Sequence, residues 1–91
     1  ADVAIVVFED LQCPDCAKLH PELRRIAAER NVPLVIRDYP LPRHDWAFPA
    51  AILARWFTLG SAAHGLDFRS FVFLNQDRIT VANLREAAEA F

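Results

Sequence analysis

Cys13 and Cys16 are the only cysteines in this 91-residue chain, and two residues separate them. They follow an apolar run over residues 3–8 and open a segment with helical periodicity. A cysteine pair with this spacing, placed where a strand passes into a helix, is typical of redox-active dithiols. The chemistry that this pattern predicts is thiol–disulfide exchange, for which we expect no cofactor.

Cys13 falls at the start of the predicted helix. Pro14 suits the first helical position, where the N–H that proline lacks would have no partner. The free N–H groups and the dipole at a helix start favour a thiolate over a thiol. We therefore expect Cys13 to be the exposed nucleophile, with Pro14 and Asp15 tuning its potential. The acidic Asp15 disfavours the thiolate, which predicts a comparatively weak oxidant.

Cys16 lies one turn further along the helix. It shares an apolar stripe with Leu19, Leu23 and Ile26, at spacings of three and four residues. We expect this stripe to face the core, so that Cys16 is the more buried thiol and resolves mixed disulfides. The opposite stripe alternates in charge, as solvent-exposed helix faces do; it consists of Asp15, Lys18, Glu22, Arg25 and Glu29.

Two other interpretations of the cysteine pair stay open. It could form a static disulfide in a non-catalytic binding module. It could also be part of a metal site with His20 as a third ligand, although structural zinc usually takes four ligands and often a second Cys or His pair. His44 and His64 are single and distant in sequence. Without such a metal, we expect His20 at the helix surface or the edge of the core.

The elements around the cysteines form a strand–helix–strand pattern. The pattern of residues 1–9 predicts a strand. Its apolar run over residues 3–8 is continuous, which favours burial of the strand on both faces. The helix covers residues 14–30, with Asn31 as a left-handed stop and Pro33 beyond it. Residues 34–39 predict a second strand. Such a unit has parallel strands and a right-handed crossover.

A proline-containing loop over residues 40–45 follows the second strand. It carries His44, which either lies near the disulfide and tunes it or is a solvated or capping histidine. Asp45 is the expected cap of a helix reaching about residue 59. That helix is almost wholly apolar, so it is either buried or covers an interaction surface. We assign Trp46, Trp56 and Phe57 to the core.

The remaining sequence predicts two further helices. Gly60 and Gly65 are expected to bracket a turn before a helix over residues 66–75, which places Phe68, Phe71 and Val72 on one face. Thr80 is the expected cap of the last helix. The core face of that helix follows i, i+3, i+4, i+7 spacing and consists of Leu84, Ala87, Ala88 and Phe91.

Residues 8–16, Phe-Glu-Asp-Leu-Gln-Cys-Pro-Asp-Cys, resemble the active-site segment of the DsbA-like thiol:disulfide oxidoreductases within the thioredoxin superfamily. Residues 37–44 and 75–80 resemble later segments of that family, in the same order. The resemblance implies an α/β fold with a single, partial thioredoxin-like domain over residues 1–91. In it, residues 1–39 form a βαβ redox unit and residues 40–91 a DsbA-type helical insertion.

Two features depart from the DsbA-like pattern. The family's domain continues into further strands, preceded by a cis-proline loop, whereas the last proline here is Pro49. We therefore expect the C-terminal strands to be missing from this chain, and an open strand edge would invite self-association. Many relatives carry a buried acid six residues before the first cysteine, where this chain has Val7.

Composition excludes several function classes. The net charge is −2, and no basic cluster points to nucleic acid or an anionic membrane. No apolar stretch approaches the ~20 residues of a membrane span. No signal peptide is present, and the chain starts at an alanine and has no methionine, so we expect a processed or excised product. The resemblance implies protein thiol and disulfide substrates, a redox partner protein and a periplasmic or cell-envelope location.

Overall fold

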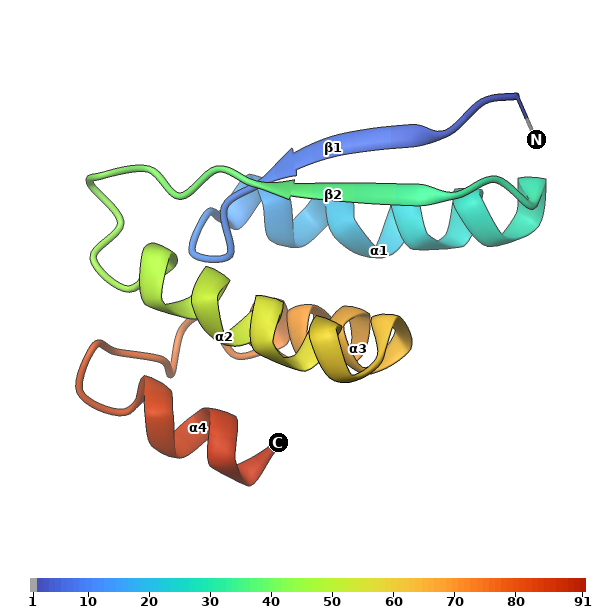
Figure 1. Cartoon of the computed structure of the whole chain (residues 1–91). Helices are drawn as coiled ribbons and strands as arrows, with labels where there is room; N and C mark the ends of the chain where they lie inside the picture. The colour runs from blue at the N-terminus through green and yellow to red at the C-terminus, as the bar shows by residue number, and fades with distance from the viewer. Residues whose placement is uncertain (1) are drawn as a thin grey trace.

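The computed structural model describes residues 2–91. A strand–helix–strand unit is followed by helices that pack beneath it (Figure 1). The elements are β1 (Ile5–Glu9), α1 (Pro14–Arg30), β2 (Leu34–Asp38), α2 (Ala47–Gly60), α3 (Ala62–Leu74) and α4 (Leu84–Ala90). Helices α1, α2 and α3 lie between the sheet and α4 (Figure 1). None of the described helices is long and apolar enough to cross a membrane.

The two strands are parallel, as the sequence predicts. Ile5 pairs with Leu34 at one end of the ladder, and Glu9 pairs with Asp38 at the other. Helix α1 connects them and ends at Asn31, whose φ of 53° is the expected left-handed stop. The pairing brings the carboxylates that end β1 and β2 to the same edge of the sheet.

The sheet is covered on one face only, so the predicted burial of the first strand on both faces is wrong. Leu34, Ile36 and Asp38 line a cavity against α2 and α3. Val6 and Phe8 are exposed, because side chains alternate along a strand and those two point away from the helices.

The core face of α1 also differs from the prediction. Leu19 and Ile26 are exposed, whereas His20 and Ala27 are buried. Helix α3 packs against α1, where Nη1 of Arg24 donates to Oγ of Ser70 over 2.9 Å. The predicted apolar stripe is therefore not buried along its whole length. Cys16, in the same stripe, does pack against the core.

The core lies mainly between α2 and α3. Trp46 is buried and Phe57 partly buried, as predicted, but Trp56 is exposed on the other side of α2. Close packing of the two helices depends on Gly65, since a Cβ there would collide with the side chain and backbone of Thr58. The core cluster consists of Leu11, Trp46, Ala50, Ala54, Phe68, Val72, Phe73, Ile79, Leu84 and Ala88.

The boundaries of the later helices differ from those predicted. Helix α2 runs to Gly60, and the single residue Ser61 separates it from α3, with its Oγ accepting a hydrogen bond from the N–H of His64. Gly65 therefore lies inside α3, and the predicted turn between Gly60 and Gly65 is wrong. Serine is among the preferred helix N-cap residues, so Ser61 starts α3 even though Gly65, a poor helix former, lies in its first turns.

Two predicted caps also have other roles. The carboxylate of Asp45 does not cap α2; its Oδ1 accepts from the side chain of Gln12 over 3.1 Å. Thr80 accepts a hydrogen bond from the N–H of Asn83, and α4 begins after that turn, at Leu84. The predicted core face of α4 is confirmed, because Leu84 and Ala88 are buried.

Candidate active site

The cysteine pair lies where β1 passes into α1. Cys13 is the N-cap residue of α1, Pro14 is the first helical residue, and no side chain caps the helix start. Both cysteines are free thiols and partly buried, and their side chains are close enough for Cys13 to act on the pKa of Cys16. Cys16 packs against the core. The predicted places of Cys13 at the helix start and of Cys16 against the core are therefore confirmed, but Cys13 is partly buried and not exposed as predicted.

The surroundings of Cys16 favour its protonated form. Burial is the largest cause that raises the pKa of the Cys16 thiol, and the backbone N–H of Asp10 partly opposes it. Contact with Cys13 and the negative charge of Glu9 raise the pKa further. Cys16 is consequently a thiol at neutral pH, and it needs a proton acceptor before it can attack a disulfide.

A buried ionic network lies behind Cys16. Glu9, His20 and Arg69 are only 2%, 1% and 5% exposed. Oε2 of Glu9 lies 2.7 Å from Nδ1 of His20, and Oε1 of Glu9 lies 3.3 Å from Nη1 of Arg69. Nη2 of Arg69 donates to Oδ1 of Asp38 over 2.6 Å. The network joins β1, α1, α3 and β2 behind the cysteine pair.

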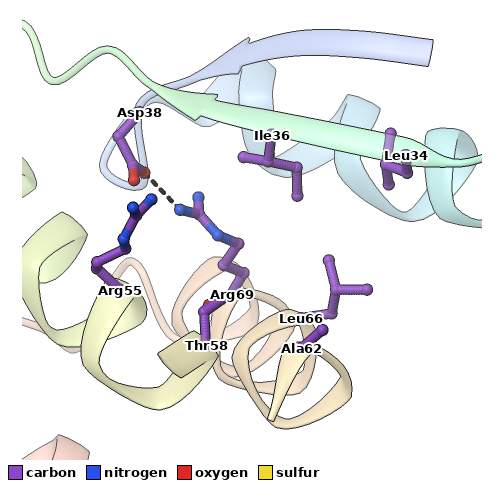
Figure 2. A pocket seen from close by; sticks show the side chains of 8 residues that line it. All are labelled: Leu34, Ile36, Asp38, Arg55, Thr58, Ala62, Leu66 and Arg69. Carbon is purple, nitrogen blue, oxygen red and sulfur yellow. Dashed lines mark hydrogen bonds and ion pairs between the residues drawn. The ribbon is translucent and has the colours of Figure 1, made fainter. Parts of the chain in front are cut away.

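The solvent side of this network is a cavity of about 150 Å³ between β2 and the α2–α3 pair. Figure 2 shows Arg69 reaching from α3 to Asp38 in this cavity, with Leu34 and Ile36 on the strand side. Arg55 also lines the cavity, from α2. One end of the buried network is thus close to solvent, while Glu9 and His20 are enclosed.

The structure corrects the expected place of His20, which is neither at the surface nor at the edge of the core. Its Nε2 is buried without a hydrogen-bond partner, and its ring lies 4.8 Å from that of Phe73. Within residues 2–91, no group of three or more His, Cys, Asp and Glu side chains could hold a metal ion. His20 therefore pairs with Glu9 instead of completing a metal site.

Asp10 connects the proline-containing loop to the cysteine segment. Its Oδ1 accepts from the N–H of Gln12 over 2.8 Å, and its Oδ2 accepts from the N–H of Leu41 over 2.7 Å. Nδ1 of His44 donates to the same Oδ2 over 2.8 Å. His44 thus contacts the residue whose N–H faces Cys16, and its tuning of the disulfide stays a prediction, as do the tuning roles of Pro14 and Asp15.

Two glutamines that sequence reasoning missed hold the backbone around Cys13. The side-chain N–H group of Gln76 donates to the carbonyls of Leu11 and Cys13 over 2.8 and 3.0 Å. Oε1 of Gln12 accepts from the N–H of Trp46 over 2.8 Å, which ties the start of α2 to the cysteine segment. No local pattern marks Gln76, since its partners are more than sixty positions away.

Comparison with known proteins agrees with this arrangement. A family model described as thioredoxin matches residues 1–90. Neither the curated proteins nor the solved structures gave a significant match. The parallel βαβ unit, with a cysteine pair at the start of its helix, lies within the matched residues. This chain belongs to the thioredoxin family.

Proposed function

We propose that the protein is a thiol:disulfide oxidoreductase that uses Cys13 as nucleophile and Cys16 as resolving thiol. The observation that carries the proposal is the contact between two free thiols at a helix start, one at the N-cap and one packed against the core. Helix N–H groups favour a thiolate at the first position, and burial favours a thiol at the second. Disulfide exchange uses this difference.

In the reducing direction, the Cys13 thiolate attacks a substrate disulfide, and one substrate sulfur leaves as a thiolate. Cys16 then loses its proton and attacks Sγ of Cys13. The Cys13–Cys16 disulfide forms, and the second substrate sulfur leaves with the electron pair. Two substrate thiols replace one disulfide, and the protein dithiol is oxidised to a disulfide. Oxidation of a substrate dithiol follows the same steps in reverse, and Cys16 then regains a proton.

The group that exchanges this proton is the Glu9–His20 pair. Glu9 is near enough for its charge to act on Cys16, and His20 lies one helical turn after Cys16 on the same face of α1. A proton taken up by the pair offsets the negative charge that appears on Cys16. Arg69 positions the carboxylate of Glu9 from the other side.

Within the thioredoxin family we propose a DsbA-like activity. The supporting features are the resemblance of residues 8–16 to that active-site segment and the helices α2, α3 and α4 that follow the βαβ unit. The same resemblance leads us to propose protein thiols and disulfides as substrates, a second redox protein as partner, and a periplasmic or cell-envelope location.

The test is to trap the intermediate with oxidised glutathione and to identify the adducts by mass spectrometry. We expect Cys16→Ser to accumulate glutathione on Cys13, because no second thiol resolves the mixed disulfide. The unchanged protein should pass on to the Cys13–Cys16 disulfide. Cys13→Ser is the matched variant, and it should react much more slowly. Equal reaction rates for Cys13→Ser and Cys16→Ser would contradict the assigned roles.

A further inference from the structure

Asp10 carries a buried carboxylate that the exchange steps do not use. The residue is 4% exposed and lies between the end of β1 and the cysteine pair. Its carboxylate accepts three hydrogen bonds, from the N–H groups of Gln12 and Leu41 and from Nδ1 of His44. Burying a carboxylate is costly unless such partners replace its water. These partners hold the side chain of Asp10, and with it the backbone, in one place.

The backbone of Asp10 acts on both cysteines. Its carbonyl accepts from the N–H of Cys13 over 3.0 Å, which closes a four-residue turn. Within that turn, Oδ1 of Asp10 accepts from the N–H of Gln12 over 2.8 Å. Burial raises the pKa of the Cys16 thiol, and the N–H of Asp10 acts against it by lowering that pKa. One residue therefore fixes the backbone of Cys13 and faces the side chain of Cys16.

The loop over residues 40–45 holds the other oxygen of this carboxylate. Oδ2 of Asp10 accepts from the N–H of Leu41 over 2.7 Å and from Nδ1 of His44 over 2.8 Å. The N–H of His44 donates to the carbonyl of Leu41 over 3.0 Å, so the loop is itself closed by a turn. A rotation of the Asp10 side chain would break both contacts with the loop. The loop thus holds the turn that presents Cys13.

We propose that Asp10, held by His44, positions Cys13 and Cys16 for exchange with each other. The inference rests on the proposed function and adds a positioning residue to it. Two groups held in reacting geometry behave as if one were highly concentrated around the other, and a small displacement lowers this effective concentration steeply. Asp10 therefore acts on the step between the two cysteines and has little influence on the attack of Cys13 on a substrate. His44 acts only through Asp10.

The test measures three quantities for Asp10→Asn and for His44→Leu. They are the equilibrium constant of the Cys13–Cys16 disulfide against glutathione, the rate at which the mixed disulfide with glutathione collapses, and the rate at which Cys13 attacks oxidised glutathione in a Cys16→Ser background. We expect each variant to lower the equilibrium constant and the collapse rate roughly ten-fold. A ten-fold change in this equilibrium makes the midpoint potential about 30 mV less negative. The rate of attack by Cys13 should stay nearly unchanged.

His44→Asn is the rescue variant, because an asparagine amide can donate a hydrogen bond from the place of Nδ1. It should restore the equilibrium constant and the collapse rate. In an Asp10→Asn background, His44→Leu should add no further loss, since contacting residues in one network are not additive. Asp67→Asn is the matched control, because Asp67 carries a 61% exposed carboxylate that pairs with Arg24. It should behave as the unchanged protein.

The outcomes separate positioning from other roles of Asp10. Midpoints that shift in opposite directions in Asp10→Asn and His44→Leu would show that the charge of the carboxylate acts on the cysteines, and would overturn the inference. Equal slowing of collapse and of attack by Cys13, or no slowing of either, would also overturn it. If circular dichroism shows that Asp10→Asn is unfolded, the comparison of His44→Leu with His44→Asn decides the question. Failure of the unchanged protein to react with oxidised glutathione would instead overturn the proposed function.

Discussion

Nη1 of Arg69 lies 3.3 Å from Oε1 of Glu9, and this contact joins α3 to the last residue of β1. Both side chains are buried, and each has a second partner, Asp38 for Arg69 and His20 for Glu9. An ion pair therefore connects α3 to the segment that leads into Cys13. In the mechanism that we propose, the stability of the fold and the chemistry of the cysteine pair depend on the same buried groups.

Loss of Arg69 should be strongly destabilising. Arg69→Met leaves the carboxylate of Glu9 buried without its cationic partner, and we expect about 3–5 kcal/mol less free energy of unfolding. Urea unfolding measures this difference. Arg85→Met is the control, because Arg85 is exposed on α4 in a surface pair with Glu89 and should cost at most about 1 kcal/mol. Equal effects of the two substitutions would show that the buried network does not stabilise the fold.

The two glycines around Ser61 should respond in opposite ways to alanine. At Gly65 a Cβ would lie 2.8 Å from Cα of Thr58 and still closer to its side chain, so α2 and α3 must separate. We expect Gly65→Ala to lower the free energy of unfolding by about 1–3 kcal/mol.

At Gly60 a Cβ meets nothing within 4 Å. Gly60→Ala should leave stability unchanged or raise it by up to about 1 kcal/mol, because alanine restricts the unfolded chain. Thermal unfolding of both variants is the measurement. A stable Gly65→Ala protein would contradict the close packing of α2 on α3.

The role of the Glu9–His20 pair predicts a change in pH dependence. The measured step is collapse of the mixed disulfide between Cys13 and glutathione into the Cys13–Cys16 disulfide. Glu9→Gln and His20→Gln should each slow this step about 100-fold at pH 7, since a positioned base is lost. The difference in rate between these variants and the unchanged protein should become smaller as the pH rises, because hydroxide then removes the Cys16 proton.

His64→Gln is the control for those variants, because His64 is an exposed histidine on α3 that packs against Phe57 and Phe91. It should leave the pH profile unchanged. A purely structural role of Glu9 and His20 predicts a different result, namely rates lowered by the same factor at every pH.

The raised pKa of Cys16 also predicts how stability depends on pH. The folded protein retains the Cys16 proton at a pH where the unfolded chain has begun to lose it. Above the ordinary cysteine pKa of about 8.5 the folded state therefore binds more protons, and the free energy of unfolding falls as the pH rises. In a Cys13→Ser background, unfolding at pH 7 and pH 10 measures this fall. It should be smaller in Cys13→Ser/Cys16→Ser, and an identical fall in both would contradict the burial of Cys16.

Local signals predicted the part of the fold that presents the cysteines. Pro14 at the first helical position and Asn31 at the end gave the bounds of α1 correctly, because each suits the backbone there. The apolar runs predicted the two parallel strands, although residues 2–4 are not part of β1. The cysteine spacing also predicted where the pair lies, because a strand that leads into a helix places such a pair at the helix start.

The buried network could not be predicted in the same way. His20 and Arg69 are polar residues that no local sequence pattern marks as buried, and the packing of α3 against α1 and the sheet encloses them. The same packing decides that His20 faces inward and Leu19 outward. Periodicity predicts which residues share a helix face, but not which of two neighbouring faces meets α3.

The most direct test of the central claim is the redox equilibrium of Cys13 and Cys16 in glutathione buffers of defined ratio. Exchange chemistry predicts a reversible midpoint between about −120 and −270 mV, the range of catalytic cysteine pairs. A midpoint below about −300 mV would identify a structural disulfide and contradict the oxidoreductase account.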